Sequence, residues 1–441
     1  MSQVMTGEAA KRLPKTAELE AYFGKYPDVH REVIVKEDIL NCGFKYSETA
    51  LERAASAQTK MYHLFSYDRI TVADMKKRES VRVPEEIRIR GGQYGLRPLI
   101  VHSRLNDNTP YSVDVVEGEL AFLADGEVIG DVEYAPRPAY YDACFADGTQ
   151  YAEIVPLTFF GYFAFLTCLR NCQYWGDKEE CKFCDINSNV RQQKESGRQY
   201  TVHKKIEPIL EVLRKIFLER PENEPRTHTL IISGGTIVRE VQKAGDIDFY
   251  LHYIEPIKAL LGNRWCMQLQ TAAKTRPELE CLKAAGVNSH QANIEVWDPR
   301  LWKILCPGKE SFVGRDEWIR RVVDSVNVFG EGYIYPNFVA GVEMARPWGF
   351  ESVDEAVKST ASGFDFLMAH GVMPRMNHWT VEPLSPLGGQ EPPPLDYYIK
   401  MNVAWYELFC KHRLPFANGL GPMGPGKSVN ANSAFQDMGE C

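Results

Sequence analysis

Four cysteines lie close together in this chain, at Cys168, Cys172, Cys181 and Cys184. Thiolates are the soft ligands that bind zinc ions and iron–sulfur clusters, and a gap of two residues between ligands, as in the last pair, is common to both. Three interpretations follow: a closed zinc site, an iron–sulfur cluster, or buried thiols that bind no metal. The density of the cysteines favours a metal centre, with an iron–sulfur cluster first.

Composition limits the partners and the compartment. The chain has 441 residues, 44% hydrophobic and 25% charged, as in an ordinary soluble protein of two or three structural units. A net charge of −8 without a long Lys/Arg run weighs against binding to nucleic acid and favours a small molecule or a protein. We expect no secretory signal and no membrane span, because the most apolar stretch, Ile154–Leu166, is short and contains Pro and Gly. The eleven cysteines are therefore expected to be reduced or metal-bound, in the cytoplasm.

Short apolar strands alternate with amphipathic helices between residues 155 and 385. Such alternation predicts a parallel sheet, and six units fit a partial barrel better than a complete one of eight. The predicted strands are Phe160–Leu166, His228–Ile232, Trp265–Gln270, Ser289–Trp297, Ile334–Ala340 and Arg375–Val381. The predicted helices are Pro208–Leu218, Ile247–Leu261, Glu278–Ala285, Asp316–Phe329 and Val353–His370.

The segments on either side of this region have a different character. Residues 1–154 are predicted to form a helical and β-rich unit, with helices Thr16–Tyr26 and Ser47–Met61 and strands Glu86–Arg90 and Leu99–His102. Residues 386–441 are predicted to form one helix, Pro394–Lys411, and a Gly/Pro-rich tail. The expected fold class is therefore α/β: a partial (β/α)6 TIM-like barrel with an N-terminal α+β extension and a C-terminal tail.

The cysteines follow the first predicted barrel strand, and parallel α/β folds carry their chemistry at the C-terminal ends of strands. Here the sequence resembles the radical S-adenosylmethionine (SAM) superfamily, whose usual signature after that strand is C-x3-C-x-aromatic-C. The resemblance implies a [4Fe–4S] cluster held by three thiolates, with SAM at the fourth iron. It also implies that SAM is cleaved to methionine and a 5′-deoxyadenosyl radical, with electrons from a flavodoxin- or ferredoxin-type donor.

The cysteine spacing departs from that signature. Cys168 and Cys172 match its first pair, but Trp175 stands where the third cysteine is usual, and Cys181 and Cys184 close the motif after a gap. An expanded spacing of similar length occurs in the tRNA-modifying Elongator-type branch. That precedent implies Cys172, Cys181 and Cys184 as ligands with Cys168 spare. The rival set, Cys168, Cys172 and Cys184, stays open.

Further resemblances follow in order along the chain. The second strand ends in Ser233, Gly234, Gly235 and Thr236, where the family carries a Gly-Gly-Glu type motif that contacts the amino group of SAM. Glycine suits such a contact because it lets a ligand approach the backbone closely. Thr236 replaces the usual Glu, and a simple turn is the structural alternative.

The third and fifth strands supply further candidate contacts. Gln268 and Gln270 lie on one face of the third strand and are expected to bind SAM or substrate. Gly341 and Glu343 end the fifth strand, in a region that loosely resembles the part of the family that backs the adenine ring.

The fourth strand carries acidic candidates. Glu295 or Asp298 is expected to meet the methionine or ribose part of SAM, by resemblance to the family. A buried carboxylate needs a partner, so a salt bridge to Lys303 or Lys309 is the alternative.

The expected reaction type depends on motifs that the sequence lacks as well as on residues that it contains. Asn377, His378 and Glu382 on the sixth strand are candidates to face the substrate, or else structural residues. The remaining cysteines contain no C-x2-C pair and no cobalamin-type motif appears. We therefore expect hydrogen abstraction from a small molecule, leading to rearrangement, cleavage or bond formation. A non-catalytic zinc or iron–sulfur protein and an RNA-modifying radical SAM enzyme are the alternatives.

The tail contains a literal phosphate-loop pattern, Gly421–Ser428. No apolar strand leads into it, and Pro422 and Pro425 remove backbone donors that such a loop needs, so nucleotide binding there is not expected. The tail or the N-terminal unit is instead expected to complete the substrate pocket, with docking through Phe416, Leu420, Met423 and Phe435.

Overall fold

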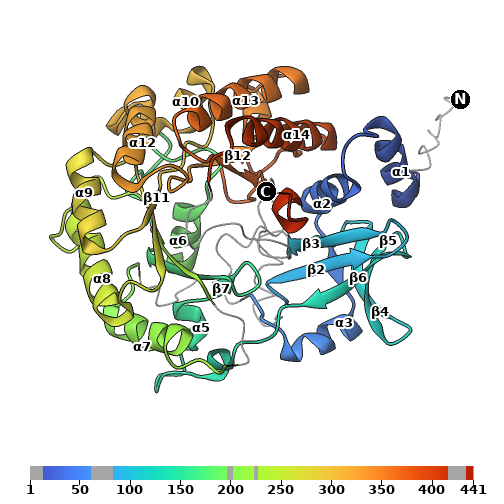
Figure 1. Ribbon diagram of the computed structural model, residues 1–441, viewed down its shortest axis with the longest axis horizontal. Coiled ribbons are helices and arrows are strands. Elements are labelled where there is room, and N and C mark those ends of the chain that lie inside the picture. Colours follow the sequence, from blue (N-terminus) through green and yellow to red (C-terminus); the bar gives the residue numbers. More distant parts are fainter. Residues whose placement is uncertain (1–12, 61–82, 196–201, 223–226, 416–433, 441) are drawn as a thin grey trace, which may run out of the picture.

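The computed structural model describes residues 13–60, 83–195, 202–222, 227–415 and 434–440. Its larger part is an incomplete ring of parallel strands with helices outside, and a second, mainly antiparallel sheet lies at the open side of the ring (Figure 1). None of the helices within these ranges is both long and apolar enough to span a lipid bilayer.

Six parallel strands follow one another around the ring in chain order. Continuous ladders join β8 (Phe163–Leu169), β9 (Thr229–Gly234), β10 (Cys266–Gln270) and β11 (Ser289–Gln291), and another joins β12 (Asn337–Ala340) to β13 (Arg375–His378). Single parallel bridges, His290 to Ile334 and Glu295 to Phe338, connect the two groups. This is the strand order of a partial (β/α)6 barrel, so the predicted fold class is confirmed.

Helices cover the outer face of the barrel. The main ones are α7 (Ile206–Phe217), α8 (Asp246–Leu261), α9 (Arg276–Ala285), α12 (Arg315–Phe329) and α13 (Val353–Ala369). These helices confirm the predicted positions. They could be predicted because apolar residues recur along each one at the helical period and face the sheet. Shorter helices lie between them: α5 (Tyr151–Ile154), α6 (Ile186–Glu195), α10 (Pro299–Leu305) and α11 (Pro307–Phe312).

Four of the six predicted barrel strands differ from the observed ones by three or more residues at an end: Phe160–Leu166, Ser289–Trp297, Ile334–Ala340 and Arg375–Val381. Two of these differences have a local backbone cause. Phe159 and Phe160 have positive φ angles of 56° and 55°, so they form a turn, and β8 begins at Phe163. A short antiparallel strand, β7 (Leu157–Thr158), precedes this turn. The strand predicted to reach Trp297 ends at Gln291, because the chain bends away and Glu295 adopts a φ of 73°, outside the strand region.

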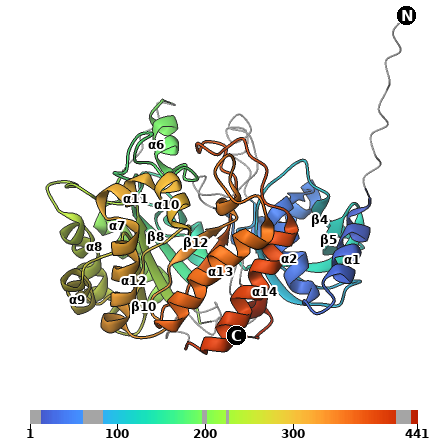
Figure 2. The same cartoon turned by 90° about the horizontal axis from the view of Figure 1, so that it is seen from above.

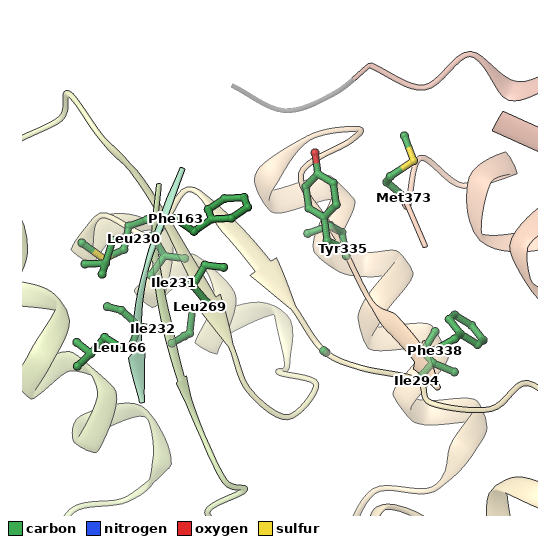
Figure 3. Packing of buried hydrophobic residues seen from close by; sticks show 14 of the residues in the cluster. Phe163, Leu166, Leu230, Ile231, Ile232, Leu269, Ile294, Tyr335, Phe338 and Met373 are labelled. Carbon is green, nitrogen blue, oxygen red and sulfur yellow. The ribbon is translucent and has the colours of Figure 1, made fainter. Parts of the chain in front are cut away.

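Side chains on the barrel strands alternate between the helix layer and the barrel axis. Leu166, Leu230 and Ile232 are buried and lie on the side of the strands opposite to Phe163 (Figure 3). Near the C-terminal strand ends, the side chains on the axis side are only partly buried, which leaves that end of the axis accessible. These residues are Thr167, Ser233, Gln270, Val339 and Asn377.

The second sheet is built from residues that precede the barrel. Its order is β1 (Lys45–Tyr46), β4 (Tyr111–Val116), β5 (Glu119–Ala124), β6 (Glu127–Tyr134), β2 (Glu86–Gly91) and β3 (Leu96–His102). Helix α1 (Lys15–Lys25) agrees with prediction, whereas the helix predicted to extend from Ser47 to Met61 is the short α3 (Glu48–Glu52) and a 3-10 turn, η1 (Arg53–Ser56). It stops there because Ala57 turns extended and bridges to Pro136; Met61 lies outside the described residues.

Helix α2 (Arg31–Cys42) was not predicted. All residues from Glu32 to Leu40 are buried, including the charged Lys36, Glu37 and Asp38. A helix that is buried on every side has no polar face and therefore gives no amphipathic pattern in the sequence.

The second sheet is bonded to both edges of the open barrel. Beside the first strand, the Glu86 carboxylate accepts the backbone N–H groups of Phe159 and Phe160, each at 2.6 Å. Beyond the last strand, the buried Arg104 donates to the hydroxyl of Thr380. The N-terminal unit therefore spans the open side of the barrel (Figure 1).

The predicted division of the chain at residues 154 and 385 stays a prediction. One cluster of buried apolar side chains runs from Tyr140 to Leu414 and so includes residues on both sides of each position. Helix α14 (Leu395–His412), predicted as Pro394–Lys411, packs against α13 and α2.

The described end of the tail docks as a short helix, α15 (Ala434–Asp437), against α2 and β3. The Phe435 ring stacks on Tyr406 at 4.0 Å between centroids. The Asp437 carboxylate accepts the Ile100 backbone N–H at 3.0 Å and the Lys36 ammonium at 2.5 Å. Phe435 is thus docked, as expected; the predicted docking residues Phe416, Leu420 and Met423 and the Gly421–Ser428 pattern lie outside the described residues.

The Asp437–Lys36 pair gives a stability test. Both side chains are fully buried, so Asp437→Asn leaves the Lys36 charge without its carboxylate. We expect a loss of about 3 kcal/mol in the free energy of unfolding, measured by urea denaturation.

Glu440→Gln is the matched control, because Glu440 pairs at 2.6 Å with Arg97 and both side chains are partly exposed. The loss there should be below about 1 kcal/mol. Equal losses in the two variants would contradict this account of α15.

Candidate metal centre

The four predicted cysteines begin on β8 and continue into the loop that follows it, at the end of the barrel where α6 lies (Figure 2). The buried Asn187, in the first turn of α6, holds this loop closed. Its side chain accepts the Cys172 N–H at 2.9 Å and donates to the Tyr174 carbonyl at 2.7 Å. Farther along, Glu180 receives a bidentate contact from Arg191, at 2.9 and 3.1 Å. These contacts hold the loop against α6.

Three of the cysteines, Cys172, Cys181 and Cys184, are partly buried and close enough to affect one another electrostatically. Hydrogen bonding from Tyr174 and Thr236 lowers the pKa of the Cys172 thiol, but burial outweighs this effect. Burial raises the pKa of the Cys172 and Cys184 thiols, and the neighbouring cysteines add to that shift. Negative charge on neighbouring thiolates such as these two would be stabilised by a shared cation, as in a metal centre.

Cys168 points elsewhere. It is fully buried and lies where the register of β8 shifts, between Thr167 and Leu169. Its electrostatic neighbours are Lys204, Tyr250 and Tyr253, and burial raises the pKa of its thiol. This placement favours the set Cys172, Cys181 and Cys184 over the rival set that includes Cys168.

A zinc site and a larger cluster differ in the spacing of their sulfurs. In a tetrahedral site with Zn–S bonds of about 2.3 Å, the sulfurs are about 3.8 Å apart. Within the described ranges, the one group of three His, Cys, Asp or Glu whose ligand atoms all lie within 4.8 Å of one another is Glu85, Glu86 and His102, on the second sheet. The cysteine sulfurs do not form such a group among the described residues, so the geometry by itself identifies no metal.

The Gly-Gly pair at the end of β9 lies directly beneath the cysteine loop. A Cβ atom at Gly235 would stand 1.9 Å from the Asn171 carbonyl oxygen and 2.6 Å from Cys172 Cα. At Gly234, a Cβ would stand 2.6 Å from the Tyr250 hydroxyl. These glycines therefore allow the loop backbone to rest on β9. Their contact with SAM stays a prediction, and the structure gives them a second reason to lack side chains.

The polar residues predicted on the third strand differ in their surroundings. Gln268 is buried and donates to the Gln291 side chain, which in turn donates to Asn293 at 3.0 Å. Gln270 is half-buried and pairs across the sheet with Ser233 at the accessible strand ends. Ser233 and Gln270 thus face the end of the barrel that carries the cysteines, while Gln268 belongs to a buried row of amides that sequence reasoning missed.

Glu295 has the salt bridge that was weighed as its alternative role. Its carboxylate lies 2.7 Å from the Lys309 ammonium, which also donates to the Asn293 carbonyl at 2.8 Å. Burial opposes the charge on Lys309, but Glu295 and two nearby thiols raise its pKa on balance. The partner is therefore Lys309 rather than Lys303, and a role for Glu295 toward SAM stays a prediction.

Two other predicted acidic residues are bound within the fold. Asp298 caps α10 by accepting a backbone N–H of its first turn at 2.8 Å. Glu343 is buried, and its carboxylate accepts from Thr360 and Tyr397, each at 2.6 Å, and from the Gly341 N–H at 2.9 Å. Both carboxylates therefore have structural partners, and a contact of either with SAM stays a prediction.

The sixth-strand candidates are divided between two faces. Asn377 is half-buried on the axis side, opposite Val339 of β12. His378 stacks on Tyr398 of α14 at 3.6 Å between ring centroids, and Glu382 is buried. Asn377 is therefore the candidate of this group that faces the accessible end of the barrel.

Sequence reasoning missed Cys306 as a neighbour of the cysteine loop. A hydrogen bond from the Cys306 thiol lowers the pKa of Cys181, against the effect of burial and with help from Lys309. The signal available in the sequence was a cysteine after the fourth strand, but no spacing rule connects it to the others.

No family model matches the chain. In sequence it is similar to a bacteriochlorophyllide c C-7(1)-hydroxylase of Chlorobaculum limnaeum, with 25% identity over 190 residues. The match covers 42% of this chain and 44% of that protein, so the chain spans less than half the length of this relative.

Among solved structures, the chain is similar to methylornithine synthase (PylB), with a TM-score of 0.41, 16% identity, and coverage of 57% of this chain and 62% of that one. It is also similar to coproporphyrinogen III oxidase (HemN) from Escherichia coli, a radical SAM enzyme, with a TM-score of 0.34, 11% identity, and coverage of 57% and 52%. Both scores lie below 0.5, so the fold assignment rests on the strand order described above.

The contact at Gly235 gives a test of how the loop is positioned. A methyl group in Gly235→Ala would meet backbone atoms of Asn171 and Cys172, so the loop must move away from β9. After anaerobic reconstitution with iron and sulfide, we expect this variant to retain well under half of the wild-type iron.

Gly245→Ala is the control, because no heavy atom lies within 4 Å of a Cβ at that position. It should bind iron as the wild type does. Full iron content in Gly235→Ala would contradict the structural account.

Proposed function

We propose that this protein is a radical SAM enzyme that holds a [4Fe–4S] cluster through Cys172, Cys181 and Cys184 and abstracts hydrogen from a small-molecule substrate. The observation that carries the proposal is the joint placement of these three sulfurs on a closed loop at the C-terminal end of a partial barrel, with Cys168 placed near α8 instead. Three thiolates leave one position of a four-iron cluster open for SAM.

The chain supplies the surroundings that such a cluster needs. Hydrogen bonding from Tyr174 and Thr236 lowers the pKa of Cys172, and hydrogen bonding from Ile186 lowers that of Cys184, which partly offsets the effect of burial. When bound, the cluster would donate one electron to SAM and generate the 5′-deoxyadenosyl radical. The protein's part is to position the two reactants and to exclude water.

Residues on the axis side of the strand ends are the proposed contacts for SAM and substrate. Ser233 and Gln270 lie side by side on neighbouring strands, and Asn377 is half-buried on β13. All three are uncharged donors and acceptors, which suits hydroxyl and amide groups of a ligand. Glu295, paired with Lys309, is the proposed charged group nearest to this end of the barrel.

The relative from Chlorobaculum limnaeum suggests which reaction to test first. That protein is named as a hydroxylase of bacteriochlorophyllide c, and hydroxylation at carbon replaces a C–H bond. Cleavage of a C–H bond is the step proposed for this chain. We infer a small-molecule substrate that loses hydrogen from a C–H bond, an electron donor of flavodoxin or ferredoxin type, and no role for nucleic acid.

The N-terminal unit is the proposed closure of the substrate pocket. It is bonded to the first barrel edge through Glu86 and to the last through Arg104, so it lies where the ring of strands is open. A radical intermediate requires such closure against water. The described part of the tail docks on α2 and β3 rather than at the open side of the barrel. Deletion of residues 418–441, as a test of whether the tail closes the pocket, would also remove Asp437. Such a deletion would therefore change the stability of the protein as well as any closure of the pocket.

Alanine substitution of the cysteines, one at a time, tests the ligand assignment. Cys172→Ala, Cys181→Ala and Cys184→Ala should each lose nearly all SAM cleavage, measured as 5′-deoxyadenosine released by the reduced, reconstituted protein. Each removes a thiolate that water replaces poorly.

Cys168→Ala is the matched control from the same motif, and its iron content should stay near that of the wild type. Loss of iron in this variant, with retention in Cys181→Ala, would show that the rival ligand set is correct. A colourless wild type that holds one zinc per chain and releases no 5′-deoxyadenosine would contradict the proposed function itself.

A further inference from the structure

A row of four amide side chains crosses the barrel one layer below the accessible strand ends. Gln268 donates to the Gln291 side chain, which donates to the Asn293 oxygen at 3.0 Å. The same oxygen accepts the Asn337 backbone N–H at 3.2 Å. This amide row therefore connects β10, β11 and β12.

The row continues onto the last strand through Arg375. Phe338 packs against Phe364 of α13, at 5.0 Å between ring centroids, so its neighbour Asn337 faces the barrel axis. Asn337 pairs in register with Arg375 of β13. The Arg375 guanidinium lies 5.9 Å from the centroid of the Tyr335 ring, two residues before Asn337. Arg375 is therefore on the axis side, beside the amide row.

Arg375 gives this layer of the barrel a positive charge. Within β8 to β13, as the structure describes these strands, it is the one Lys, Arg, Asp or Glu residue. Burial lowers the pKa of its guanidinium to about 10, so it is protonated at neutral pH. Because the low dielectric of a protein interior screens charge weakly, this layer attracts an anion.

Two oxygens of the row point to a ligand that donates hydrogen bonds. Gln268 is 1% exposed and Asn337 9%, and neither Gln268 Oε1 nor Asn337 Oδ1 has a hydrogen bond among the described residues. Buried oxygens in a finished core have donors, so these two are expected where a ligand completes the site. The half-buried Gln270 and Asn377 lie one layer above, toward the end of the barrel that carries the cysteines.

We propose that Arg375 and the amide row bind one end of the substrate, a carboxylate with a hydroxyl or amino donor beside it. The carboxylate accepts from the guanidinium, and the donor bonds to the oxygens of Asn337 and Gln268. Neighbouring strands are about 4.8 Å apart, so the two ligand groups are only a few bonds apart. The inference rests on the proposed function, because it names the class of substrate on which that function acts.

A carboxylate fits this layer better than a phosphate ester. One guanidinium among uncharged amides balances a single negative charge, whereas a phosphate dianion would leave a second charge buried without a counterion. Phosphate is therefore included in the test as the rival anion.

The test measures which small molecules the full chain binds after anaerobic reconstitution and addition of SAM. Glycolate and glycine carry a hydroxyl or amino donor beside a carboxylate, acetate carries the carboxylate alone, and glycolamide is the neutral analogue. Dissociation constants come from proton NMR titrations, and from phosphorus NMR for inorganic phosphate. We expect glycolate or glycine to bind most tightly and acetate more weakly. Glycolamide and phosphate should bind at least about tenfold more weakly than the best probe.

Variants of the row locate the binding. Arg375→Gln should weaken binding of the best probe by about tenfold or more, and Arg375→Lys, which keeps the charge, should recover part of that loss. Asn337→Leu should reduce the preference for the best probe over acetate, because it removes an acceptor of the donor group.

Two residues outside the row provide matched controls. Arg315, at the start of α12, also lies over an aromatic ring, that of Trp297, at 4.7 Å. Asn402 of α14 is a buried amide whose oxygen likewise has no hydrogen bond among the described residues. Arg315→Gln and Asn402→Leu should bind every probe as the wild type does.

The inference is overturned if the wild type binds no carboxylate, binds glycolamide as well as glycolate and glycine, or binds phosphate most tightly. It is also overturned if Arg375→Gln binds the best probe unchanged. If that variant loses its iron through misfolding, the wild-type order of affinities and Asn337→Leu decide. In these cases SAM cleavage by the wild type still supports the proposed function. A wild type that binds no iron and releases no 5′-deoxyadenosine overturns the proposed function, and this inference with it.

Discussion

The site depends on one close backbone contact, between the start of the cysteine loop and the end of β9. Gly235 has no side chain, so Asn171 and Cys172 can rest directly on it, and the Gly235 N–H donates to the Leu169 carbonyl at 3.1 Å. The next residue on each side is also bonded: the Gln173 N–H donates to the Thr236 carbonyl at 2.8 Å. The position of Cys172 above the barrel is set by these contacts, and the later cysteines are placed from there.

Other parts of the fold act on the same loop from different sides. Asn187 closes it from α6, Arg191 holds its acidic corner at Glu180, and the turn 305–309 supports Cys181. Each of these contacts is a hydrogen bond or ion pair within the chain, and together they position the loop. The barrel as a whole is also held by contacts within the chain, because the second sheet is bonded to both of its open edges.

The barrel was predictable because its helices have one apolar and one polar face and its strands are short apolar runs between them. Helix α2 could not be predicted from such a pattern, because Lys36, Glu37 and Asp38 are buried along with their apolar neighbours. The predicted end of β11 was wrong for a local reason. Glu295 has a positive φ angle, which cannot be predicted from its residue type.

Among the site residues, the cysteine motif was visible because its members are close in sequence. The contact between Cys306 and Cys181 joins segments more than a hundred residues apart, and no local pattern reports it. For Glu343 and Asp298, the sequence indicated that each carboxylate has a partner but did not identify the partner. An acidic residue at a strand end indicates a partner, but only the structure tells that these partners are Thr360, Tyr397 and a helix N-terminus.

The central claim is that three cysteines hold a four-iron cluster and leave one iron for SAM. The most direct measurement is the Mössbauer spectrum of protein reconstituted with iron-57, recorded with and without SAM. The account predicts a [4Fe–4S] spectrum in which about one quarter of the iron signal shifts when SAM is added. A four-iron spectrum that SAM leaves unchanged, or a protein that takes up zinc instead of iron, would contradict it.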